Sequence, residues 1–238
     1  MPTIGAATPI TRMNYGTQYN DKKINYAQPR REWANVNITD DSWRSTSTYT
    51  TGDYNDTLNL NGSQQKVTAN LGAGYNRVST GWPSANSNIN VQMYGGYTTL
   101  IGTGHTLNLN SGKGNDDVRI GFFDDGAVTT NYKGTLNLAN GNNNVQINGY
   151  ARGNNLTFNA GTAGNNSFSI TDYSMDDIKE VKKIASNMYQ LTDFKGNTYN
   201  INSAFKSITL HTRIVNAQNP YGYFQSTTKT LEQLDQLK

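Results

Sequence analysis

The stretch Gly112–Ile120 reads GKGNDDVRI, a turn rich in glycine and asparagine followed by alternating aliphatic and polar residues. Ten segments of the chain repeat this order, and clear copies among them begin at Gly52, Gly141 and Gly164. A unit this short cannot bury an apolar core alone, so neighbouring units must stack and bury it together. The repeats therefore predict an all-β protein, a right-handed parallel β-solenoid or β-roll.

The spacing of the apolar residue after each turn predicts how the coils divide into two sheets. Most successive positions are 9 to 12 residues apart, and two steps of 18 residues indicate inserted half-coils or loops. Two ordinary steps, about 20 residues, make one coil with two strands that face each other. One sheet is expected to contain Leu58, Val78, Leu107, Leu136 and Leu156, and the other to contain Val67, Ile89, Val118, Val145 and Phe168.

The segments that flank the repeats are expected to cover the apolar ends of the stack. The repeat region is predicted to span 52–170, with an N-terminal cap over 1–51 and a C-terminal capping region over 171–238 that contains a helix and a hairpin. The C-terminal region predicts a helix over 175–186, a hairpin over 189–201, a strand over 208–210, a turn at 219–222 and a short helix with Leu231, Leu234 and Leu237 on one face.

Composition limits the classes of protein that the chain can belong to. The 238 residues include no cysteine, so disulfides and thiolate metal sites are excluded. The net charge of +3 and the scattered basic residues give no signal for nucleic acid. No apolar run reaches membrane-spanning length, and Met1–Arg12 lacks the pattern of a cleavable signal peptide. We expect a secreted or extracellular protein that needs no such signal peptide.

Gly112, Gly114 and Asp116, followed by an aliphatic residue, resemble the glycine-aspartate nonapeptide of RTX-type calcium-binding β-rolls. Asp56 stands in the ligand position of a second, partial match. The resemblance implies one or two calcium ions held between turns by Gly112, Gly114, Asp116 and Asp56. In the proposed alignment Asp56 and Asp116 belong to opposite rows of turns, so they would not share an ion.

The departures from this resemblance leave an alternative open. Asparagine replaces the ligand aspartate in the other copies, at Asn76, Asn143 or Asn144, Asn154 and Asn166. Calcium prefers several oxygen ligands that include carboxylates. Stacked asparagine side chains that bond along the ladder would replace the metal.

The fifteen tyrosines predict a carbohydrate-binding surface at the edges of the coils, because flat aromatic rings stack on sugars beside amide and guanidinium donors. The alternative is that tyrosine simply suits a half-exposed β surface. The residues expected to contact the ligand are Tyr94, Tyr97, Arg119, Tyr132, Tyr150 and Arg152.

The sequence favours a non-catalytic role over an enzymatic one. The two histidines lack zinc spacing, and no nucleophile motif is present. Adjacent aspartates such as Asp116 and Asp117 point to opposite sides of a strand, which does not suit paired acid-base work. We expect an exported structural or adhesive module that binds a polysaccharide or a cell surface. The alternative is a polysaccharide lyase, epimerase or hydrolase, or its accessory module, by analogy with other β-helices.

Overall fold

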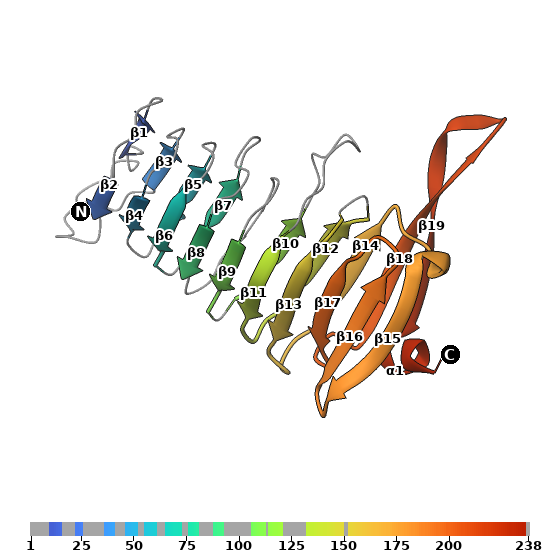
Figure 1. Cartoon of the computed structure of the whole chain (residues 1–238). Helices are drawn as coiled ribbons and strands as arrows, with labels where there is room; N and C mark the ends of the chain where they lie inside the picture. The colour runs from blue at the N-terminus through green and yellow to red at the C-terminus, as the bar shows by residue number, and fades with distance from the viewer. Residues whose placement is uncertain are drawn as a thin grey trace, which may run out of the picture.

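The computed structural model consists almost entirely of β-strands, which confirms the all-β prediction. It describes residues 10–15, 22–25, 36–40, 46–51, 55–60, 65–72, 76–80, 88–92, 106–112, 114–120, 132–149 and 152–236. Figure 1 shows the strands side by side along one axis, with the N-terminal strands at one end and the C-terminal hairpins at the other.

One side of the stack is a ten-stranded sheet in which the neighbours from β2 to β17 run parallel. In spatial order it contains β15 (Ile178–Ala185), β16 (Met188–Asp193), β17 (Thr198–Asn202), β13 (Asn155–Ala160), β11 (Lys133–Leu138), β9 (Thr106–Asn110), β8 (Asn88–Gln92), β6 (Lys66–Asn70), β4 (Thr46–Thr50) and β2 (Lys22–Asn25).

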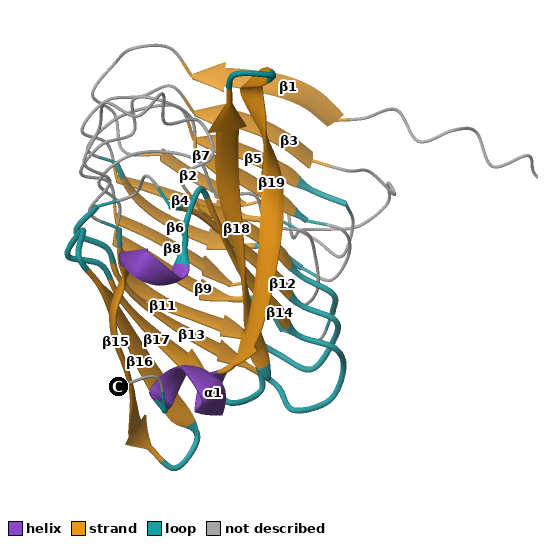
Figure 2. Cartoon of the chain, turned by 90° about the vertical axis from the view of Figure 1, so that its right-hand side faces the viewer, coloured by secondary structure: helices purple, strands orange, loops and turns teal. Residues whose placement is uncertain are grey.

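The facing side contains a four-stranded and a five-stranded sheet (Figures 1 and 2). The first has the order β1 (Ile10–Tyr15), β3 (Val36–Asp40), β5 (Thr57–Leu60) and β7 (Arg77–Thr80). The second has the order β10 (Asp117–Ile120), β12 (Asn144–Asn148), β14 (Ser167–Thr171), β18 (Ser207–Asn216) and β19 (Asn219–Thr230). The chain thus passes repeatedly between two parallel sides, an arrangement consistent with a β-solenoid.

The predicted assignment of apolar positions to the two sheets is wrong for the first part of the repeat region. Val67 and Ile89 lie on β6 and β8 of the ten-stranded sheet, together with Leu107, whereas Leu58 and Val78 lie on the facing side. The cause is the first 18-residue step. Strand β9 pairs directly with β8, so that step returns the chain to the same sheet, whereas the sheet assignment counts it as a single crossing between the sheets.

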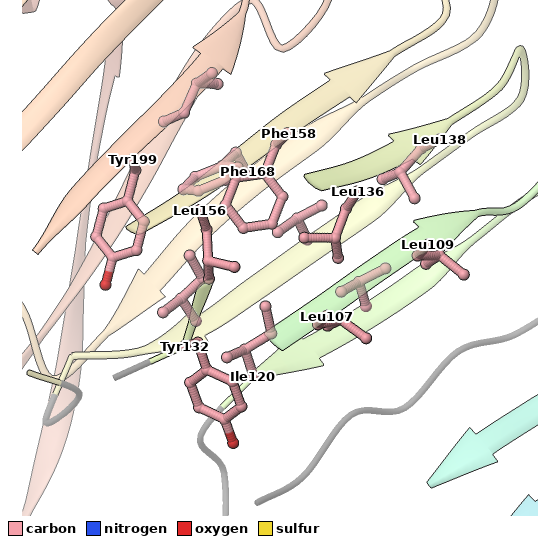
Figure 3. Packing of buried hydrophobic residues seen from close by; sticks show 14 of the residues in the cluster. Leu107, Leu109, Ile120, Tyr132, Leu136, Leu138, Leu156, Phe158, Phe168 and Tyr199 are labelled. Carbon is pink, nitrogen blue, oxygen red and sulfur yellow. The ribbon is translucent and has the colours of Figure 1, made fainter. Parts of the chain in front are cut away.

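A narrow apolar core fills the space between the two sides. The residues that point inward alternate with polar ones, and Leu58, Val118, Leu136 and Val145 are each at most 1% exposed. Aromatic rings occupy this core toward its C-terminal end, where Phe168 packs edge-to-face against Phe158 (Figure 3) and against Phe205.

The sheets extend into the segment 1–51. Strands β1 and β2 pair in parallel with β3 and β4, which continue the ladders of β5 and β6. The sequence shows no repeat over these residues, yet their strands continue the same parallel ladders as the later rungs.

The C-terminal region contains more strand than the sequence predicts. Of the helix expected over 175–186, only Met175–Asp177 is helical, as one 3₁₀ turn (η1), and most of the rest forms β15. Antiparallel pairing with β16 overrides the helical spacing of the apolar residues, and Val181 alone is buried on this strand. The hairpin of β16 and β17 and the helix α1 (Leu231–Asp235) are confirmed, with Leu231 and Leu234 buried; Leu237 lies outside the described residues.

Within the described part of the chain, no helix has both the length and the apolar character that a membrane crossing requires.

Candidate functional site

Asp116 occupies the turn before β10 and is 2% exposed. The Ser111 hydroxyl donates to its Oδ2 at 2.5 Å, and its backbone N–H donates to Oδ1 of Asn143 at 3.2 Å. Its Oδ1 atom is buried and accepts no hydrogen bond from the described residues. Burial raises the pKa of the Asp116 carboxyl to about 6, although the bond from Ser111 opposes the shift.

Asparagine side chains occupy the equivalent position in other rungs. The Asn143 amide donates to Ala139 O at 2.9 Å and to Oδ1 of Asn166 at 2.8 Å. The Asn76 amide likewise donates to Gly72 O, four residues earlier, at 2.6 Å. An ionised aspartate has no proton to donate in this way. The structure therefore shows an asparagine ladder and identifies Asn143, not Asn144, as the counterpart of Asp116.

Asp56 belongs to the same side of the stack as Asp116. Its backbone N–H donates to Oδ1 of Asn76 at 3.0 Å, which repeats the bond between Asp116 and Asn143. The expectation that the two aspartates lie in opposite rows is therefore wrong, and the miscounted step at Ile89 explains the error. Asn154 instead lies in the opposite row, where its Oδ1 accepts the Tyr132 N–H at 2.9 Å.

The donor set around Asp116 does not fit a calcium ion. Calcium takes six to eight oxygen ligands, usually with several carboxylates. The described residues contain no group of three or more acidic or histidine side chains able to hold a metal. Gly112 and Gly114 add only backbone atoms, and the Asn143 oxygen already accepts a hydrogen bond. The asparagine side chains supply hydrogen bonds between these rungs.

The residues predicted to bind carbohydrate do not form one surface in the described part of the chain. Tyr132 is 1% exposed and belongs to the core. Arg119 lies on the outer face of β10 and pairs with Asp117 at 2.9 Å, whereas the exposed Arg152 precedes β13 of the ten-stranded sheet. Tyr94, Tyr97 and Tyr150 lie outside the described residues.

A second polar cluster has a structural role in the hairpin of β16 and β17. Asp193 is 4% exposed and accepts from the Tyr173 hydroxyl at 3.1 Å and from the Asn197 amide at 2.7 Å. Burial and the Asp193 charge hold the pKa of Tyr173 well above its usual range. Lys195 donates to Gly149 O at 2.8 Å and pairs with Asp177 at 3.2 Å, which ties the hairpin to the last rungs.

Exposed aromatic residues gather on the hairpin of β18 and β19, which sequence reasoning missed. Tyr221 is 85% exposed, and Tyr223 and Phe224 are each about half exposed. The residues 219–222 predict a turn, but they begin β19, and the reversal lies at Ala217 and Gln218. The close spacing of three aromatics was the available signal. Figure 1 shows this hairpin extending beyond the rest of the stack.

The outward face of this hairpin is defined by alternation along β18. Because Ile208 and Leu210 are buried, the odd-numbered residues of the strand point away from the core. Their partners on β19 complete three cross-strand pairs, which are Arg213 with Phe224, His211 with Ser226, and Thr209 with Thr228.

Hydrogen bonds hold this outward face in place. His211 Nδ1 lies 2.8 Å from the Ser226 hydroxyl, and the two threonine hydroxyls, of Thr209 and Thr228, are 3.0 Å apart. Arg213 Nη2 donates to Tyr221 O at 2.9 Å, which holds the guanidinium beside the aromatic tip. The result is a polar stripe that ends in an aromatic and cationic group, with Ser169 of β14 adjoining Thr209.

Comparison with protein-family models, curated proteins and solved structures finds no significant match to the chain. Function is therefore inferred from the geometry of the described residues.

Proposed function

We propose that the chain is a non-catalytic, exported β-solenoid with an adhesive role, which binds carbohydrate through the tip and the outward face of the β18–β19 hairpin. The observation that carries the proposal is the group of exposed aromatics at the hairpin tip, of which Phe224 lies on the outward face opposite Arg213 and Tyr223 on the other face, opposite Ile214. Exposed aromatic clusters mark interaction sites, and aromatic faces beside hydroxyl, amide and guanidinium donors match the alternating apolar and hydroxyl surfaces of a sugar.

In this proposal the parallel rungs are a spacer that presents the hairpin. We propose that they wind as a right-handed coil, the usual hand of parallel crossovers. The N-terminal cap would lie within 1–51, where β1 and β2 are the last strands of their sheets. The C-terminal cap would consist of the two hairpins and α1. Calcium is left out of the proposal because the donor set at Asp116 does not fit it.

Polysaccharide retention by the whole chain tests this function. The protein is passed over a panel of immobilised neutral and acidic polysaccharides, beside a Tyr221→Ala/Phe224→Ala variant. We expect retention of the wild type on at least one polysaccharide and a loss of about tenfold or more in the variant, since each aromatic contact contributes on the order of 1 kcal/mol.

A matched control is Phe194→Ala, which removes an aromatic ring that is 71% exposed on the other hairpin. It should bind like the wild type. Failure of the wild type to be retained on any member of the panel would refute the proposed function. Equal melting temperatures would show that the tip variant remains folded.

A further inference from the structure

We infer that the ligand of the β18–β19 hairpin is an anionic polysaccharide with carboxylate groups, of the polyuronate class, and that Arg213 binds its carboxylates. This inference rests on the proposed carbohydrate-binding function and names the substrate class of the same surface.

The first support is the charge of the hairpin. Residues 207–230 contain no aspartate or glutamate, and Arg213 lies on the outward face, whereas Lys229 pairs with Ile208 and lies on the other face. A face with a cation and no carboxylate attracts an anionic partner. The outer face of β10 differs, because there Arg119 is neutralised by Asp117.

The second support is the position of Arg213 itself. Among the described residues no acidic side chain pairs with Arg213, and one of its five N–H donors is used by Tyr221 O. The remaining donors form a planar fork, the group that binds a carboxylate through two hydrogen bonds. Phe224 lies directly across the strand pair, so a ring that stacks on this aromatic side chain would bring its carboxylate to the guanidinium.

The third support is the length of the stripe. The pairs that contain Arg213, His211 and Thr209 follow at intervals of two residues, about 7 Å each. The hydroxyls of Thr209, Ser226 and Thr228 line the stripe behind the aromatic tip. An extended polymer fits a stripe of this length better than a single sugar, with one of its carboxylates at Arg213.

The test compares polygalacturonate with the same polymer after methyl esterification, which removes the charge and keeps the backbone. Affinity of the whole chain is measured at low and high salt for wild type, Arg213→Gln and Arg213→Lys. We expect the wild type to prefer the acidic form by about tenfold, with the preference reduced by salt. Arg213→Gln should lose about tenfold on the acidic form alone, and Arg213→Lys should retain part of it.

The outcomes separate this inference from the proposed function. Equal affinity for both forms, or an Arg213→Gln variant that binds like the wild type, overturns the polyuronate assignment and leaves carbohydrate binding intact. No binding to either form or to the wider panel refutes the proposed function itself. A dimer in solution that Phe224→Ala dissociates would assign the surface to a second copy of the chain and overturn both.

Discussion

The parallel rungs and the antiparallel C-terminal hairpins differ in what they leave exposed. In the described rungs, between Asn37 and Thr171, no large hydrophobic side chain is exposed. All the exposed ones in the described part of the chain follow residue 177, namely Ile184, Phe194, Val215, Tyr221, Tyr223 and Phe224.

The length of the strands explains this difference. A rung strand of four to six residues has two or three inward positions, and neighbouring rungs cover all of them. Strands β18 and β19 have 10 and 12 residues, so their distal halves extend past the sheet that covers the proximal halves. Apolar residues there have no rung to pack against. Their exposure is the feature on which the proposed binding surface depends.

The largest expected effect concerns two glycines with positive φ, one in each region. A Cβ at Gly134 would lie 1.8 Å from Leu107 O, whereas at Gly196 nothing lies within 4 Å. We expect Gly134→Ala to lower the free energy of unfolding by more than about 4 kcal/mol, because the rungs must move apart. Gly196→Ala should cost only about 1–2 kcal/mol of backbone strain. Urea unfolding measures both, and similar losses would contradict the tight contact between rungs.

The next comparison uses two phenylalanines. Phe168 is 1% exposed between Phe158 and Phe205, whereas Phe194 is 71% exposed in the β16–β17 turn. Phe168→Ala should lower the free energy of unfolding by about 3–5 kcal/mol through loss of burial and formation of a cavity. Phe194→Ala should change it by less than about 0.5 kcal/mol. A large loss for Phe194→Ala would contradict the exposure of this side chain and show that the hairpin turn packs against another part of the protein.

The sequence could predict the strands but not the order of the rungs. Alternation at Leu107 and Leu109 or at Val145 and Ile147 identifies each strand, because the apolar residues of one parity are the ones buried in the core. The distance along the chain between Ile89 and Leu107 does not reveal whether the intervening residues cross the stack once or twice. That uncertainty reversed the sheet assignment of every earlier rung.

The candidate site was less predictable for a similar reason. The number of tyrosines and their place near turns predict the carbohydrate surface, and neither property separates the buried Tyr132 from the exposed Tyr221. Exposure at the hairpin tip depends on how far β18 and β19 extend beyond the stack, which is a property of the whole fold. Helical spacing in β15 failed for the same reason, because pairing with β16 decides its structure.

A smaller effect, of opposite sign, is expected at Asp116. Its folded-state pKa of about 6 lies above the ordinary 3.8, so the ionised carboxylate destabilises the fold above pH 6 and the penalty disappears below about pH 4. Asp116→Asn places at this position the residue found at Asn76 and Asn143, and its side-chain amide adds a donor for Gly112 O. We expect a gain of up to about 3 kcal/mol in the free energy of unfolding at pH 7, which falls toward zero at pH 4.

The control for Asp116 is Asp117→Asn, which removes a partly exposed ion pair with Arg119 and should cost less than about 1 kcal/mol. The same samples test the metal. We expect calcium and chelator to leave the melting temperature of the wild type unchanged. A calcium-dependent rise that Asp116→Asn abolishes would show that an ion, and not the asparagine ladder, joins these rungs.

The smallest effect separates the ladder on the outer face of the rungs from the polar surface of the hairpin. The Asn137 amide donates to Asn110 at 2.7 Å, and its oxygen accepts from Asn159 at 2.8 Å. Asn137→Ala should lower the free energy of unfolding by about 1 kcal/mol, because these bonds are exposed to water and each contributes little. Gln225→Ala, on the exposed edge strand β19, should change it by no more than a few tenths of a kcal/mol. Equal effects would mean that the asparagine side chains add no more to the stack than any polar surface residue, and the contrast between rungs and hairpin would then depend on the core alone.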